Sequence, residues 1–177
     1  MRRLVLSLFP LLLIAALAFA PAGCKRRKKK APEEPAGLAT MVHASDPRAQ
    51  TQLVRGFHGV EQNAWRWTAG SFAATLRPPA GAAQKGATLQ FKFVIPDVIL
   101  NQLKQMTLSV KVNGQALPPE TYTKAGEYTY SRDVPASLLT QDVVNVEFAL
   151  DKFLPASAQD IRDLGVIMTM VGFEAKP

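Results

Sequence analysis

The chain has 177 residues, and its 21 lysine and arginine residues outnumber its 14 aspartate and glutamate residues, which gives a net charge of +7. Eight cations lie at Arg2, Arg3 and Lys25–Lys30, so the chain beyond Lys30 holds 13 basic and 14 acidic residues. This nearly neutral remainder excludes the broad basic surface of a nucleic-acid-binding domain. With one cysteine and two histidines, the sequence also gives no disulfide framework and no metal-ligand spacing, so we expect neither a metal nor a cofactor.

The first residues have the order of an export signal. Arg2 and Arg3 precede an apolar run from Leu4 to Ala20, and the small residues of "PAG" then lead to Cys24. This succession is typical of a signal peptide that is removed from the mature protein. The apolar run only approaches the length of about 20 residues that a membrane-spanning helix needs.

The end of this segment resembles the signal of bacterial lipoproteins. Ala22-Gly23-Cys24 is similar to the last three positions of the lipobox, whereas Pro21 stands where that family usually has leucine. The resemblance implies that residues 1–23 are removed and that Cys24 receives diacylglycerol, which would anchor the protein in the bilayer. Because Lys25 follows the cysteine and not an aspartate, it also implies the periplasmic face of the outer membrane or the cell surface. The alternative is an uncleaved signal anchor in which Cys24 is not modified.

Two further segments precede the expected domain. Lys25–Lys30 would add attraction to anionic head groups, worth about 1 kcal/mol per charge near the surface, or would serve as a solvated spacer. Ala31–Gln50 is rich in alanine, proline and glutamate and has no periodicity, which predicts an extended linker. We therefore assign residues 24–50 to the anchor, the basic run and the linker, and residues 51–177 to one folded domain.

Alternating apolar and polar residues predict several antiparallel strands, each with one buried face. The clearest are "SFAATLR" (71–77), "TLQFKFVI" (88–95), "TLSVKVN" (107–113) and "VVNVEFALD" (143–151). The stretch "GVIMTMVGF" (165–173) is apolar on both faces and predicts a central strand, and weaker strands are expected at 52–58 and 127–132.

The connecting segments fit an all-β fold. Asn113-Gly114 predicts a tight turn, while "RPPAGAAQKGA" (77–87) and "LPPE" (117–120) predict loops. Short helices are expected at 98–105 and 156–163. Many short strands with few helices indicate a single jelly-roll-like antiparallel β-sandwich of about eight strands.

Five short motifs occur in an order that resembles a known type of module: "GFHGVE", "WRWT", "VKVNG", "VPASLL" and "DIRDLGV". They are similar to small accessory β-sandwich domains of bacterial envelope and polysaccharide-handling proteins. These domains resemble carbohydrate-binding or galactose-binding-like domains. The resemblance covers residues 54–173. It implies a β-sandwich with a glycan-related role, and it carries over no catalytic residue.

The two tryptophans of "WRWT" are the candidate ligand-binding residues, together with His58. Trp65 and Trp67 are two residues apart on an expected strand, so they share a face and could stack on sugar rings. The alternative is that both rings seal the core. His58 at a strand end is otherwise a surface or hydrogen-bonding residue.

Arg66 is expected to point away from the tryptophans and to form a structural ion pair. Its partner would be Glu61, or Asp160 or Asp163 near the last strand, so that the pair would tie the first strands to the last. The alternative for Asp160, Arg162 and Asp163, which lie in a loop before the last strand, is capping and ion pairing within that loop. A calcium site there would lack the dense alternating carboxylates that such loops use.

Catalytic motifs are missing from the sequence: it has no Gly-x-Ser-x-Gly, no His-Glu-x-x-His and no phosphate-binding glycine loop. We therefore expect a membrane-anchored envelope lipoprotein, not an enzyme, whose β-sandwich binds glycan. The alternative is a structural or protein-interaction lipoprotein that uses the sandwich for assembly. The expected partners are the lipid bilayer, through Cys24 and Lys25–Lys30, and polysaccharide or another envelope protein. A hydrolase is a third hypothesis, and it would require convergent carboxylates in a cleft.

Overall fold

The computed structural model describes residues 37–177 of the chain. The expected signal peptide (residues 1–23), Cys24 and the basic run Lys25–Lys30 lie outside the described residues. The strands in the described part are β1 Met41–His43, β2 Leu53–Glu61, β3 Trp65–Leu76, β4 Ala87–Ile95, β5 Met106–Val112, β6 Gln115–Tyr122, β7 Gly126–Val134, β8 Val144–Leu150 and β9 Ile167–Ala175. The helices there are α1 Ala82–Lys85 and α2 Asp97–Leu103, with short 3-10 turns η1 Pro47–Thr51 and η2 Ala136–Leu138.

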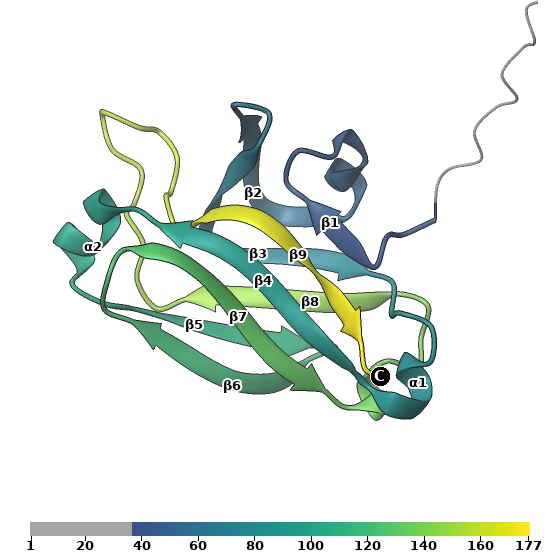
Figure 1. Cartoon of the computed structure of the whole chain (residues 1–177). Helices are drawn as coiled ribbons and strands as arrows, with labels where there is room; N and C mark the ends of the chain where they lie inside the picture. The colour runs from purple at the N-terminus through teal and green to yellow at the C-terminus, as the bar shows by residue number, and fades with distance from the viewer. Residues whose placement is uncertain (1–36) are drawn as a thin grey trace, which may run out of the picture. The chain divides into compact units, whose positions relative to one another are not determined.

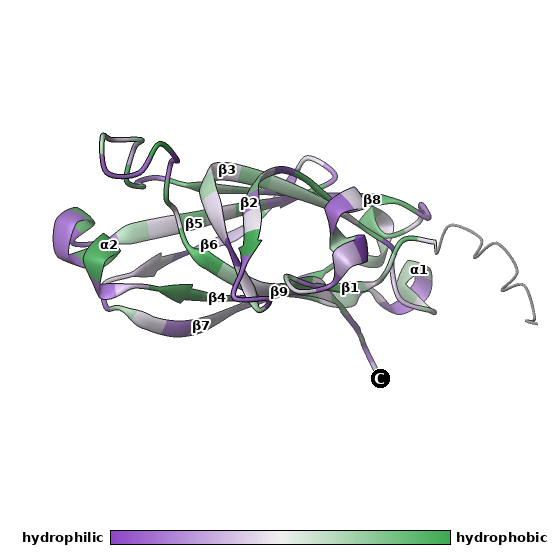
Figure 2. Ribbon diagram, turned by 90° about the horizontal axis from the view of Figure 1, so that it is seen from above, coloured by the Kyte–Doolittle hydropathy of each residue, from purple (hydrophilic) through white to green (hydrophobic). Residues whose placement is uncertain are grey.

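The strands form two layers that share one long strand. Neighbouring strands follow the order β6-β5-β8-β3-β9-β4-β7, with β1 beside β9 and β2 beside β3, and every pairing is antiparallel. Strand β3 pairs with β8 through Ser71–Leu76 and with β9 through Arg66 and Trp67. It therefore connects the layer of β6, β5, β8 and β2 to the layer of β9, β4, β7 and β1 (Figures 1 and 2). The predicted antiparallel β-sandwich is confirmed.

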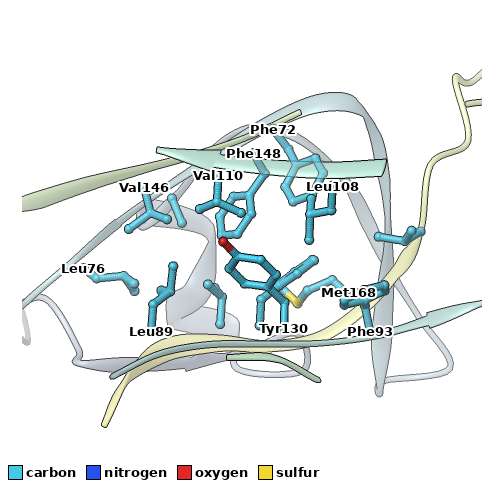
Figure 3. Packing of buried hydrophobic residues seen from close by; sticks show 14 of the residues in the cluster. Phe72, Leu76, Leu89, Phe93, Leu108, Val110, Tyr130, Val146, Phe148 and Met168 are labelled. Carbon is cyan, nitrogen blue, oxygen red and sulfur yellow. The ribbon is translucent and has the colours of Figure 1, made fainter. Parts of the chain in front are cut away.

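Apolar side chains from both layers meet in one core (Figure 3). The Phe72 ring from β3 stacks on Phe148 from β8, with ring centroids 4.9 Å apart, and contacts Phe91 from β4 at 5.5 Å. Aromatic pairs of this kind contribute beyond the area that they bury. The alternation read from the sequence holds here, because the inward positions of β4, β5 and β8 are buried while the positions between them are half-buried or exposed.

Polar contacts join β6 to β7. Tyr130 of β7 donates its hydroxyl to the carbonyl oxygen of Pro118 in β6 at 2.8 Å, and Arg132 forms a 2.7 Å ion pair with Glu120. Burial raises the pKa of Tyr130 to about 12, so the phenol remains a donor at neutral pH. Tyr122 is buried as well, and its hydroxyl has no hydrogen-bond partner among the described residues.

The loop predicted at "LPPE" is wrong, because Pro118 and Pro119 lie within β6. This strand is hydrogen-bonded to β5 and stands at one end of the strand order. A proline is tolerated on such a strand because its missing N–H removes no bond to a second neighbour.

The segment assigned to the linker contains folded structure. Met41–His43 forms β1 against β9, and η1 follows it. Gln52 is buried, and its side-chain amide bonds with both the N–H and the carbonyl of Ala39 and with the carbonyl of Thr75, at 2.8 to 3.0 Å. Folded structure therefore begins before residue 51.

The two helix predictions have different outcomes. The helix expected at 98–105 is α2, whereas the helix expected at 156–163 is wrong, because those residues form an irregular loop. Side-chain caps within this loop, such as Asp160 on the N–H of Arg162 at 2.9 Å, replace helical hydrogen bonds. Within residues 37–177, no helix has the length and apolar character needed to cross a membrane.

Candidate functional site

Trp65 and Trp67 begin β3, and both side chains are half-buried. Their rings meet edge to face, with centroids 6.3 Å apart and an interplanar angle of 83°. Arg66 and Thr68, the alternate residues, are buried, so the two tryptophans share the other side of the strand. Trp67 also packs against the core cluster. The rings are thus neither fully buried nor fully exposed.

The strand register extends the tryptophan side of β3 across the second layer. Trp67 lies opposite Ile167 of β9, Ile167 lies opposite Val94 of β4, and Val94 lies opposite Glu127 of β7. Directly opposite residues of antiparallel strands project to the same side of a sheet. We call this side, formed by β1, β9, β4, β7 and the start of β3, the outer face.

A second row of the outer face lies beside the first. His43 of β1 is opposite Met170 of β9, which is opposite Lys92 of β4, which in turn is opposite Thr129 of β7. His43, Lys92 and Thr129 are exposed, whereas Met170 is buried among them. The row combines a cation, an imidazole and a hydroxyl group around an apolar centre.

Two hollows lie on the outer face and share part of their lining. One, of about 400 Å³, is lined by Val94, Glu127 and Thr129 among others, and the second, of about 320 Å³, by residues that include His43 and Glu174. Lys92 and Thr169 line both hollows. The two hollows therefore adjoin at Lys92.

The ion pair expected for Arg66 is wrong. Arg66 is 5% exposed, and its guanidinium donates to the carbonyl oxygens of Ala44 at 2.9 Å and His58 at 3.1 Å and to the side-chain oxygen of Gln50 at 3.3 Å. None of the ion pairs within residues 37–177 involves Arg66. All three acceptors are neutral: a backbone carbonyl just after β1, a backbone carbonyl of β2 and the side-chain amide of Gln50 in η1.

Arg162 takes the role that we expected of Arg66. It forms ion pairs with Glu61 at 2.7 Å and with Asp160 at 2.8 Å, and thereby ties the end of β2 to the loop before β9. Hydrogen bonds from Arg162 lower the pKa of Asp160 to about 2, so this carboxylate is ionised at neutral pH. Glu61 and Asp160 are thus joined through Arg162, for which the sequence predicted capping and ion pairing but did not indicate Glu61 as a partner.

His58 and Asp163 meet through the backbone. His58 Nε2 lies 2.8 Å from the carbonyl oxygen of Asp163, so this nitrogen carries the proton that is donated. The Asp163 carboxylate accepts from the N–H of Ala156 at 3.0 Å. Both residues hold the loop before β9 against β2, and His58 does not lie in either hollow of the outer face.

The loop between β8 and β9 forms a third hollow, of about 480 Å³, with Gln102 of α2. Leu154 and Leu164, which line it, hydrogen-bond to each other through their backbones at 2.8 and 2.9 Å. Ile161 on this loop is 89% exposed, the highest value among the large exposed apolar residues of the described part. Within 37–177, no group of three or more His, Cys, Asp or Glu side chains is placed to hold a metal ion.

Sequence reasoning did not single out Lys92, His43 or Thr169. The alternation in "TLQFKFVI" does place Lys92 on the polar side of its strand. Nothing in the sequence, however, indicates that β1 and β9 bring His43 and Thr169 beside it.

No protein-family model and no curated protein sequence matches this chain. Similar solved structures include an acetyl xylan esterase from the rumen bacterium Butyrivibrio proteoclasticus, at 11% identity and a TM-score of 0.45, covering 80% of this chain and 34% of the esterase. They also include the CBM36-1 domain of a xylanase from the hindgut metagenome of Trinervitermes trinervoides, at 8% identity and a TM-score of 0.43, covering 78% of this chain and 98% of that domain. A CBM4 structure is 14% identical with a TM-score of 0.33, covering 76% of this chain and 81% of that one. This chain spans about a third of the esterase's length, and similarity at this level concerns the fold alone.

Proposed function

We propose that this chain is a membrane-anchored, non-catalytic protein that binds glycan on the outer face of its β-sandwich. The observation that carries the proposal is the pair of half-buried tryptophans, Trp65 and Trp67. They lie at the start of β3, which forms part of the outer face. Sugar rings present C–H groups to aromatic faces, and polar side chains beside the rings fix the hydroxyl groups. The hollows at Lys92 supply polar side chains on the same outer face.

The charge arrangement around Glu61 and Asp160 supports a binding role over hydrolysis. A glycosidase needs one carboxyl group that is protonated at working pH. Here Arg162 holds both carboxylates in ion pairs and lowers the pKa of Asp160. Asp160 is therefore suited to holding the loop in place, not to donating a proton to a leaving group.

Binding is tested by titrating the protein with soluble polysaccharides while recording tryptophan emission and acrylamide quenching. We expect a saturable blue shift and protection from quenching. Trp65→Ala should weaken binding about tenfold, because this ring is not part of the core cluster and its stacking surface is lost. Trp67 remains in that variant as the fluorescent reporter.

The matched control is Ser71→Ala, an exposed position further along β3 where the strand pairs with β8. It should bind as the unmodified protein does. Emission that responds to no polysaccharide would contradict glycan binding and favour the assembly role, for which the exposed Ile161 beside the loop hollow is the supporting observation.

The anchor is tested separately by Cys24→Ser. We expect the variant to take up no radiolabelled palmitate and to leave the membrane fraction, because a hydroxyl group does not form the thioether to lipid. Lys25→Gln, which leaves the cysteine in place, is the control and should still be labelled. Undiminished label in Cys24→Ser would refute the lipoprotein assignment.

A further inference from the structure

We propose that the outer face selects a glycan in which one carboxylate-bearing sugar is flanked by uncharged sugars, and that Lys92 binds that carboxylate. The inference rests on the proposed function, because it names the class of glycan that the same face would take. It follows from where the charged residues lie in the two adjoining hollows.

Lys92 is the cation at the centre of these hollows. It is exposed, it lines both of them, and none of the ion pairs within residues 37–177 involves it. Thr169 accompanies it in both linings, and His43 lies two strands away in the same row, with Met170 of β9 between them. An ammonium group without a partner beside a hollow favours an anionic ligand group, since charge-assisted hydrogen bonds are the stronger ones.

The acidic residues of the hollows are divided between them. Glu127 lines only the first hollow and Glu174 only the second, where Glu174 accepts a hydrogen bond from Gln90 at 2.7 Å. Carboxylates accept hydrogen bonds from sugar hydroxyl groups but oppose a second carboxylate. A glycan that runs through both hollows therefore meets a cation in the middle and an acceptor on either side.

Lys92 lies next to the row of the outer face that contains Trp67, Ile167 and Val94 and ends at Glu127. Val94, two residues along β4, is opposite Ile167 and through it Trp67, and two residues of a strand span about 6.6 Å. A sugar that packs on this row would thus be close to the position of one bound at Lys92. A polymer with a carboxylate on every sugar would place negative charges beside Glu127 and Glu174. The outer face therefore favours a glycan whose carboxylates are separated by uncharged sugars.

The test uses the full chain in detergent on a glycan array with three classes: uncharged glycans, glycans with single uronate sugars between uncharged ones, and glycans with uronate at every sugar. We expect the strongest binding in the second class. For the best ligand, the dissociation constant is then measured for the unmodified chain, for Lys92→Gln and for Lys111→Gln. Lys111 is also an exposed lysine, on β5 in the other layer.

Lys92→Gln should weaken binding of the carboxylate glycan about tenfold and leave binding of its methyl ester unchanged, whereas Lys111→Gln should change neither. Equal binding of the acid and its ester, strongest binding in another class, or an unaffected Lys92→Gln variant would overturn this inference while leaving glycan binding in place. If no class binds, the proposed function itself fails.

Discussion

Replacing Arg66 with methionine is expected to lower the free energy of unfolding by about 3 kcal/mol, because hydrogen bonds from a buried charged donor are worth roughly 1.5–3 kcal/mol each and unpaired buried acceptors are costly. Methionine fills a similar volume but donates nothing. The carbonyl of the fully buried Ala44 would lose its 2.9 Å bond and that of His58 its 3.1 Å bond. The measurement is urea denaturation followed by tryptophan fluorescence.

Two further variants separate hydrogen bonding from charge. Arg66→Lys keeps the charge but not the planar guanidinium, which donates several hydrogen bonds at once. Its free energy of unfolding should therefore lie between those of the unmodified protein and Arg66→Met. Arg55→Met removes an exposed arginine whose 3.4 Å pair with Glu147 should contribute less than about 1 kcal/mol. Equal effects of Arg66→Met and Arg55→Met would show that the buried guanidinium does not hold the first turns to β3.

Gly56→Ala is expected to destabilise the protein by about 3 kcal/mol, whereas Gly59→Ala on the same strand should change stability by less than about 0.5 kcal/mol. Gly56 has a φ of +71°, and a Cβ there would overlap the carbonyl oxygen of Ser71 and lie 2.7 Å from Cα of Phe72. Gly59 would bring its Cβ within 4 Å of nothing.

The difference arises from the irregular register of β2. The pairing of β2 with β3 shifts on both sides of Arg55, next to Gly56, so the strand bends and brings its backbone close to β3 at this point. Thermal unfolding of both variants in parallel provides the comparison. Midpoints that agree with each other would mean that the bend adjusts without cost and that the positive φ is not required.

The sequence by itself determined the all-β class and most of the inward-facing residues. In "TLQFKFVI", for example, Leu89, Phe91 and Phe93 were expected inside and are buried. The period of two is a local property, so it can be read without knowing which strands pair. The same-side placement of Trp65 and Trp67 followed from the same rule.

Only the tertiary structure decided which groups meet. Arg66 binds backbone carbonyls, and because every residue has a carbonyl, such partners leave no trace in the residue types. β1 is too short and its segment too rich in alanine and proline to give a strand pattern, and it is a strand because β9 lies beside it.

The candidate site depends on the same long-range pairing. Lys92 and His43 become neighbours through Met170 of a third strand, and a shift of one residue in either register would turn one of them to the core. Strand register is set by how the whole sandwich packs. For this reason the sequence showed the aromatic pair, whereas the hollows and the cation between them required the folded chain.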